Sequence, residues 1–168
     1  MKSDSMKRVA IAGLLLAMNV ALSSFGLPVP GGHLYLCDVV ICTAALLLDP
    51  FSAFLVGGVG SFIGDLLFYP PPMFVSLITH GLQAVVIACI SRSKRGKRSL
   101  PKDALAVAVG GVIMVVGYSL GRAFVYATPA YALVKLPFEI LQAAVGAILG
   151  LLIVGRLRGK KKTAKTAS

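Results

Sequence analysis

The chain has few of the features on which soluble enzymes depend. Of its 168 residues only 14% are charged, whereas 57% are hydrophobic, which excludes an ordinary soluble domain. It contains no GxxxxGK[ST] motif, so it cannot bind ATP through a P-loop. Any energised transport must therefore draw its energy from a partner or from an ion gradient.

Cysteine is also scarce, and tryptophan is absent. The cysteines, Cys37, Cys42 and Cys89, show no CxxC spacing, which argues against a disulfide framework or a metal site and favours small packing residues. We find no paired carboxylates on one helix face and no metal-ligand cluster, so we expect no enzyme activity, no metal and no cofactor. Without tryptophan, the aromatic side chains available for packing are Tyr and Phe, and a large flat ring could stack on Tyr118, Tyr126 or Tyr131.

What the chain does have is long apolar runs. They are unbroken rather than alternating, which indicates helices and not barrel strands, and most are long enough to cross a hydrocarbon core. The sequence therefore predicts an all-α polytopic membrane protein with six transmembrane helices. The predicted spans are 8–26, 34–49, 52–69, 73–91, 103–125 and 132–155.

Basic residues sort between the loops. All but Arg122 and Lys135 of the 17 Lys and Arg lie at the N-terminus, in the loop 91–102 or in the C-terminal tail. An even number of spans puts these three places on one side, which the positive-inside rule makes the cytoplasm, so both termini are expected inside. The net charge of +11 does not indicate nucleic-acid binding, because the basic clusters lack interleaved aromatics and flank apolar spans. We expect contact with membrane lipid and no nucleic-acid partner.

The sequence predicts one membrane domain with a short tail. Residues 1–158 show no soluble module and no convincing repeat, and we interpret them as a single six-helix domain. Residues 159–168 are a low-complexity run of Lys, Thr and Ala, for which we predict a disordered basic cytoplasmic tail.

Polar side chains within the spans share one depth. On the predicted topology they fall in the outer half, and the inner half holds almost none, which favours one site opening outward over a pore. They are Asn19, Asp38, Asp65, His80, Gln83, Tyr118, Arg122, Glu139 and Gln142. Because polar groups are costly in a membrane, such residues are functional candidates.

Several of these residues are paired at helical spacing in the last three spans. The pairs are His80 with Gln83, Tyr118 with Arg122, and Glu139 with Gln142. Residues three or four apart lie on one helix face. If the three faces meet, they form a pocket with a cation, a carboxylate, an imidazole, two amides and a phenol, which suits a small heteroaromatic ligand.

Each of these residues also has a purely structural interpretation, which the sequence leaves open. Arg122 and Glu139 fit a structural ion pair, and His80 fits a hydrogen bond to a neighbouring helix. Asp38 follows the first outer loop and fits a helix N-cap or a partner of the helix dipole. Asp65 lies one turn below the YPPP loop and fits a residue that holds that loop.

Small residues form a second pattern. The first span carries Gly13, Ala17 and Ala21 at four-residue intervals, and the third carries Gly57, Gly58, Gly60 and Gly64. Small ladders allow helices to approach closely in lipid. Packing inside this chain and docking of another membrane subunit both remain open.

Two long segments carry a family resemblance. PVPGGHLYLCDVVICTAALLLDPFSAFLVGGVGSFIGDLL and LPFEILQAAVGAILGLL resemble substrate-binding S components of energy-coupling factor (ECF) vitamin transporters, over roughly residues 8–155. The most similar subgroup is the one assigned to riboflavin, pyridoxine and hydroxymethylpyrimidine uptake. The resemblance implies a six-helix fold in a bacterial cell membrane that binds one vitamin-like molecule near the outer face.

The resemblance also implies roles for particular residues. The first outer loop, residues 27–33 with Gly31, Gly32 and His33, would act as a lid. Ligand contacts would come from the lid and the later helices, which gives the set His33, Asp38, His80, Gln83, Tyr118, Arg122, Glu139 and Gln142. An Ala-xxx-Ala motif on the first helix would dock a transmembrane coupling subunit driven by two ATPase subunits. Here its register falls on Gly13 and Ala17 or on Ala17 and Ala21.

The sequence therefore predicts a vitamin-binding S component that captures its ligand from outside, closes the lid and tips in the membrane to release it. We expect a pyridoxine- or hydroxymethylpyrimidine-like vitamin, with riboflavin as the other candidate. The competing hypothesis is a stand-alone proton-coupled transporter that uses Asp38, Asp65 or Glu139. A membrane-embedded enzyme is a third hypothesis, for which the sequence offers no catalytic constellation.

Overall fold

Over its described residues the protein is a bundle of six helices, most of them of membrane length, with one small β-hairpin. A computed structural model describes residues 2–92 and 99–166. The elements are α1 (Lys2–Ser23), β1 (Gly26–Val29), β2 (Gly32–Tyr35), α2 (Cys37–Leu47), α3 (Pro50–Phe54), η1 (Leu55–Val59), α4 (Gly60–Phe68), α5 (Met73–Ser91), α6 (Leu100–Gly121), η2 (Arg122–Tyr126) and α7 (Pro129–Thr166). Within these described ranges, five stretches are long and apolar enough to cross a membrane, and α2 is a shorter apolar helix. The predicted all-α six-helix fold is confirmed.

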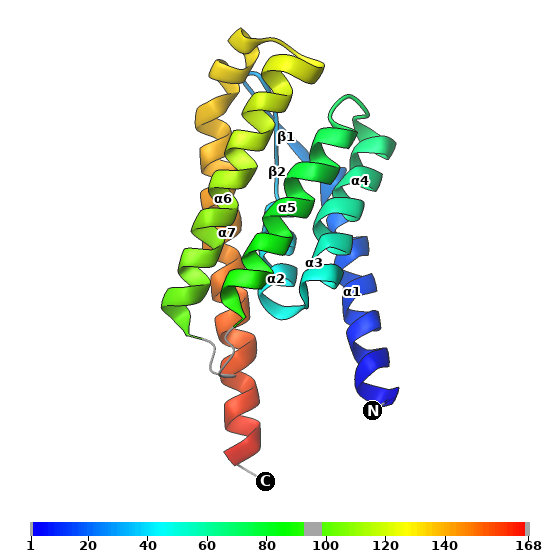
Figure 1. Cartoon of the computed structure of the whole chain (residues 1–168), viewed down its shortest axis with the longest axis vertical. Helices are drawn as coiled ribbons and strands as arrows, with labels where there is room; N and C mark the ends of the chain where they lie inside the picture. The colour runs from blue at the N-terminus through cyan, green and yellow to red at the C-terminus, as the bar shows by residue number, and fades with distance from the viewer. Residues whose placement is uncertain (1, 93–98, 167–168) are drawn as a thin grey trace.

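The helices run roughly side by side, and both termini lie at the same end of the bundle (Figure 1). The hairpin, which lies within the connection 24–36, is behind the opposite end of the bundle, the end that also carries the connections 69–72 and 127–128 (Figure 1). The predicted span 73–91 coincides with α5, whereas the second span is shorter than predicted, because residues 34 and 35 belong to β2.

The short helix α2 is the innermost element. Ile41, Ala44, Ala45 and Leu46 are fully buried, and the helix packs against α1, α5 and α7. Its apolar residues contribute to both hydrophobic clusters of the core. An apolar helix enclosed by protein does not need the length of a lipid-exposed span, which explains why α2 is only 11 residues long.

The third predicted span is one continuous helical rod, α3–η1–α4. It begins at Asp49, whose carboxylate accepts the backbone N–H of Ser52 at 3.0 Å, and Pro50 occupies the first turn. That hydrogen bond from the Ser52 backbone lowers the pKa of Asp49. The π-helical turn η1 lies in the middle of the rod, and Asn19 of α1 donates to the carbonyl of Val56 there at 2.7 Å.

The small residues of this rod pack inside the chain. A Cβ at Gly57 or Gly58 would lie within 3 Å of α5, and one at Gly60 or Gly64 would meet Asn19 or Ser23 of α1. The glycines therefore allow α5 and α1 to approach the rod closely. For this ladder, packing within the chain is the interpretation that the structure supports.

The loop between α1 and α2 forms a β-hairpin, which the sequence does not predict. Residues 26–29 pair antiparallel with 32–35, and the turn uses Gly31 at φ +80° and Gly32 at φ +145°. Both φ values lie in the region that only glycine adopts readily. We refer to residues 26–35 as the lid hairpin.

The end of the bundle that carries the termini has its own polar contact. Arg158 of α7 pairs with the buried Asp103 of α6, and its Nη2 donates to the carbonyl of Leu46 at 3.0 Å. This contact ties α6 and α7 to the last turn of α2.

The last helix is longer than predicted. It continues to Thr166, through most of the segment 159–168 for which the sequence predicts a disordered tail. Lys and Ala have high helix propensity, which is compatible with a helix over this segment. Residues 167 and 168 lie outside the described part of the chain.

Candidate functional site

A cavity lies beneath the lid hairpin, at the end of the bundle opposite the termini. It is partly open, and aromatic and polar side chains from the lid hairpin and the surrounding helices line it. Its aromatic lining consists of His33, Tyr35, Tyr69, His80, Tyr118 and Tyr126. Its charged lining consists of Asp65, Arg122, Lys135 and Glu139.

The cavity brings together six of the eight ligand residues expected from the sequence. They are His33, His80, Tyr118, Arg122, Glu139 and Gln142. The remaining two, Asp38 and Gln83, are buried behind the cavity wall and contact its residues from there. Which of the eight touch a ligand stays a prediction.

Arg122 connects the lid hairpin to α7. Its Nη1 donates to the carbonyl of Gly31 at 3.0 Å, and its Nε and Nη2 both lie 3.3 Å from Oε1 of Glu139. The other oxygen of Glu139 accepts the hydroxyl of Ser119 at 3.0 Å, and the guanidinium lies 5.3 Å from the ring centre of Tyr126. The ion pair that the sequence leaves open is present, and it also holds the lid backbone.

Lys135 is a cavity residue that the sequence analysis missed. Its side chain is 2% exposed, and its Nζ donates to the carbonyl of His33. The sequence does contain a signal for this residue, because Lys135 is one of two basic residues outside the three basic regions and lies one turn before Glu139. Two cations, Arg122 and Lys135, therefore bind successive parts of the lid backbone.

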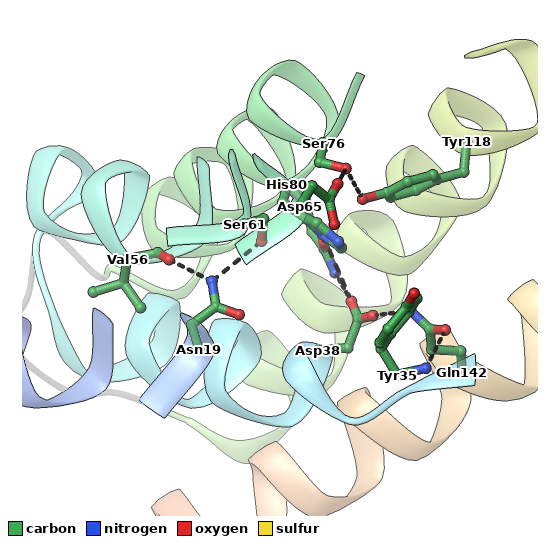
Figure 2. A network of polar contacts seen from close by, with 11 residues as sticks. Asn19, Tyr35, Asp38, Val56, Ser61, Asp65, Ser76, His80, Tyr118 and Gln142 are labelled. Carbon is green, nitrogen blue, oxygen red and sulfur yellow. Dashed lines mark hydrogen bonds and ion pairs between the residues drawn. The ribbon is translucent and has the colours of Figure 1, made fainter. Parts of the chain in front are cut away.

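Asp65 belongs to a different polar chain in the cavity wall. Its carboxylate accepts the hydroxyl of Ser76, and Ser76 Oγ lies 2.5 Å from the hydroxyl of Tyr118 (Figure 2). Because Ser76 donates to Asp65, its oxygen accepts from Tyr118. Asp65 thus orients a cavity tyrosine through Ser76, which lies in the first turn of α5 directly after the YPPP loop.

Asp38 is the centre of a buried amide network. Its two oxygens accept from Nε2 of Gln83 at 3.0 Å and from Nε2 of Gln142 at 2.6 Å (Figure 2). Gln142 in turn accepts the backbone N–H of Tyr35 at 3.0 Å, and Gln83 Oε1 lies 2.7 Å from Nδ1 of His80. The N-cap interpretation of Asp38 is wrong, since its side chain caps no backbone group of α2, whereas its place in the first turn of α2 fits a partner of the helix dipole.

The donor atoms of Cys37, Asp38 and His80 lie within 4.8 Å of one another. Both Asp38 oxygens already accept amide hydrogens, and Nδ1 of His80 is engaged with Gln83. The geometry therefore gives no reason to place a metal ion there.

Tyr35 on the lid hairpin remains a neutral phenol. Burial, followed by the nearby charge of Asp65, raises its pKa to about 12. Its hydroxyl therefore stays available as a hydrogen-bond donor throughout the physiological pH range.

The small residues of α1 face away from the bundle. Gly13, Ala17 and Ala21 are exposed, and a Cβ at Gly13 would meet nothing within 4 Å. The opposite face of α1 carries the buried Leu15, Asn19 and Ser23. Among the described residues, none covers the small face, so packing within the chain does not account for this ladder.

Comparisons with known proteins agree with this architecture. A family model described as the S component of an ECF-type riboflavin transporter matches residues 3–159. A protein of Pyrococcus woesei, described as an uncharacterized protein in the gap 3′ region, is 30% identical over 136 residues, covering 80% of this chain and 89% of that protein. A solved structure, described as the S component of a bacterial ECF transporter, superposes with a TM-score of 0.76 over 94% of this chain and 99% of that chain, at 21% sequence identity.

Proposed function

Because the chain belongs to the family of ECF-type riboflavin transporter S components, we propose that it captures riboflavin from outside the cell. The chain is a multi-pass membrane protein and a transporter subunit, not an enzyme. The observation that carries the substrate proposal is the cavity itself, which combines several aromatic rings with convergent polar groups beneath a hairpin held by two cations.

The cavity fits a flat heteroaromatic ring that carries a polar chain. Tyr35, Tyr69, Tyr118 and Tyr126 offer ring faces and edges for an apolar ring system. Arg122, Glu139 and Gln142 offer donors and acceptors for hydroxyl groups. The description of the family model names riboflavin, which favours it over pyridoxine and hydroxymethylpyrimidine.

Calorimetry on the purified chain in detergent tests the substrate. Riboflavin, pyridoxine, hydroxymethylpyrimidine and thiamine are titrated separately, without ATP and without any partner. We expect one-to-one binding of riboflavin and weak or no binding of the others. Tight binding of pyridoxine or hydroxymethylpyrimidine instead would replace the substrate and leave the role as a capture subunit in place.

Two variants connect the binding to the cavity. Glu139→Gln removes the ion pair with Arg122 while keeping a hydrogen-bonding side chain, and we expect it to weaken riboflavin binding about tenfold or more. Arg156→Ala is the control, because Arg156 is exposed at the opposite end of α7. Equal losses in both variants would exclude the cavity as the site.

We further propose that the exposed small face of α1 docks a transmembrane coupling subunit, which two ATPase subunits drive. Gly13, Ala17 and Ala21 leave a surface against which another helix can approach closely. The basic end of the bundle faces the cytoplasm in this arrangement, so that the cavity opens outward. The chain then tips in the membrane to release its ligand inside.

Co-purification with a coupling subunit and its ATPases tests the docking face. Ala17→Leu places a large side chain on the small face, and we expect it to abolish complex formation while riboflavin binding by the isolated chain is unchanged. Ala104→Leu on α6 is the matched control, since Ala104 is also exposed but lies on another helix. A complex that survives Ala17→Leu and fails with Ala104→Leu would move the interface to α6.

A further inference from the structure

One histidine in the cavity wall is held by a chain of buried hydrogen bonds with a defined direction. His80 of α5 lines the cavity and is 2% exposed. Its ring centre lies 5.1 Å from that of Tyr118, and its Nδ1 lies 2.7 Å from Oε1 of Gln83. The hydrogen bond of the ring to a described residue uses Nδ1, and the other ring nitrogen, Nε2, is left for the cavity that His80 lines.

The direction of the chain can be followed from the lid hairpin inward. The backbone N–H of Tyr35 can only donate, so the side-chain oxygen of Gln142 accepts it, and the amide nitrogen of Gln142 faces Asp38. An ionised carboxylate can only accept, so Gln83 also presents its amide nitrogen to Asp38. Gln83 must then present its oxygen to His80.

An amide oxygen accepts but cannot donate, so Nδ1 of His80 carries the proton. In a neutral imidazole the second nitrogen is then an acceptor. Charged groups near the ring are Asp38, whose Oδ1 lies 3.9 Å from Nδ1, and Asp65, which interacts with His80 electrostatically. The reverse direction requires a proton on Asp38 so that it can donate to Gln83.

We propose that Nε2 of His80 is a hydrogen-bond acceptor that selects ligands carrying an N–H or O–H donor at this part of the cavity. Gln83 and Asp38 act as positioning residues that hold the Nδ1–H tautomer. This inference deepens the proposed function and rests on it, because riboflavin offers both an imide N–H on its ring and hydroxyls on its ribityl chain. A ligand that presents only acceptors to His80 is disfavoured, since two acceptors would then face each other.

The tautomer can be read directly by NMR, because the chain contains only two histidines, His33 and His80. Protein labelled with ¹⁵N-histidine is examined without ligand, and His33→Gln assigns the spectrum. We expect His80 to show a protonated Nδ1 and an unprotonated Nε2. An Nε2–H tautomer, or protons on both nitrogens, would overturn the inference whether or not riboflavin binds.

Two matched amide variants separate positioning from general damage to the network. Gln83→Leu removes the acceptor for Nδ1–H, and we expect a mixture of tautomers. Gln142→Leu removes the other amide that bonds Asp38 but does not contact His80, and we expect the Nδ1–H tautomer to persist. If Gln83→Leu does not fold, Asp38→Asn lets the Gln83 amide turn over and provides the same test. A tautomer that survives both Gln83→Leu and Asp38→Asn would exclude positioning by this chain.

Ligand addition tests the acceptor role. We expect riboflavin to shift the Nε2 resonance. Two analogues each lack one kind of donor: 3-methylriboflavin lacks the imide N–H, and lumiflavin lacks the ribityl hydroxyls. We expect one of the two to bind the wild type about tenfold less tightly than riboflavin does. His80→Phe should remove that preference. Equal discrimination by the wild type and His80→Phe would overturn the inference. If riboflavin does not bind, the proposed substrate fails, and the compound that does bind must shift Nε2 for the inference to stand.

Discussion

The Nζ of Lys135 on α7 donates a hydrogen bond to the carbonyl oxygen of His33 on the lid hairpin. The two residues are 102 positions apart in the chain, so the contact exists only when the last helix lies against the lid hairpin. Since a backbone carbonyl is the acceptor, the contact depends on the path of the hairpin and not on the identity of the residue at position 33.

Replacing Lys135 by Met should loosen the lid hairpin. The variant keeps an unbranched apolar chain but removes the charged donor, and a hydrogen bond to a charged group contributes about 1.5–3 kcal/mol. We expect riboflavin to dissociate about ten- to a hundredfold faster, measured by stopped-flow fluorescence. Lys102→Met is the control, because Lys102 is exposed in the first turn of α6. Unchanged dissociation in Lys135→Met would show that the lysine does not hold the lid.

A methyl group at Gly31 should have a similar effect for a different reason. Gly31 has φ +80°, and a Cβ there would lie 3.0 Å from the Cβ of Lys135 and 3.1 Å from its backbone nitrogen. Gly31→Ala therefore adds about 1–2 kcal/mol of backbone strain and pushes the hairpin away from α7. We expect weaker riboflavin binding in calorimetry. Gly13→Ala, where a Cβ meets nothing within 4 Å, should leave binding unchanged.

Replacing Asn19 should lower the free energy of unfolding of the protein. Its Nδ2 donates to Val56 at 2.7 Å and to Ser61 at 3.1 Å, which joins α1 to the π-helical turn of the neighbouring rod. Asn19→Ala leaves a buried carbonyl without a donor, at a cost of about 1–3 kcal/mol. Unfolding in mixed detergent micelles should report that loss, and Met18→Ala on the exposed side of α1 should not. Similar losses in the two variants would point to a general sensitivity of α1.

The ion pair between Arg158 and Asp103, at the end of the bundle that carries the termini, should show energetic coupling in a double-mutant cycle. Arg158→Met leaves Asp103, which is 2% exposed, without its cation. Because Arg158 itself is 30% exposed, we expect a loss of about 1–3 kcal/mol, below the range for fully buried pairs. Adding Asp103→Asn should recover part of it, whereas Arg156→Met, an exposed neighbour, should have little effect. Additive losses in the double variant would show that the two charges do not stabilise each other.

The sequence predicts the helices well, because apolar runs of membrane length carry their own signal. The helix α5 matches its predicted span, and His80 and Arg122 lie at the predicted cavity. The hydrogen-bond partners of residues far apart in the chain cannot be predicted in this way. Nothing in the spacing of Asp38 shows that its carboxylate accepts from amides 45 and 104 residues away.

The lid hairpin shows the same limit. Its strands are short, and Gln142 and Lys135 from α7 bind its backbone, so its conformation depends on contacts that no local pattern reveals. Lys135 itself was visible as a cation in an apolar span, but only the structure gives it a partner in the lid.

The position of α2 has a consequence for how the protein is made. This helix is only about 16 Å long and carries the buried Asp38, whose second amide partner, Gln142, is synthesised about a hundred residues later. During translation the nascent chain therefore holds a carboxylate in an apolar segment that cannot complete its hydrogen bonds until α7 leaves the ribosome. Stable membrane integration of α2 should thus be a late event, and truncation before Gln142 should leave this segment accessible to water.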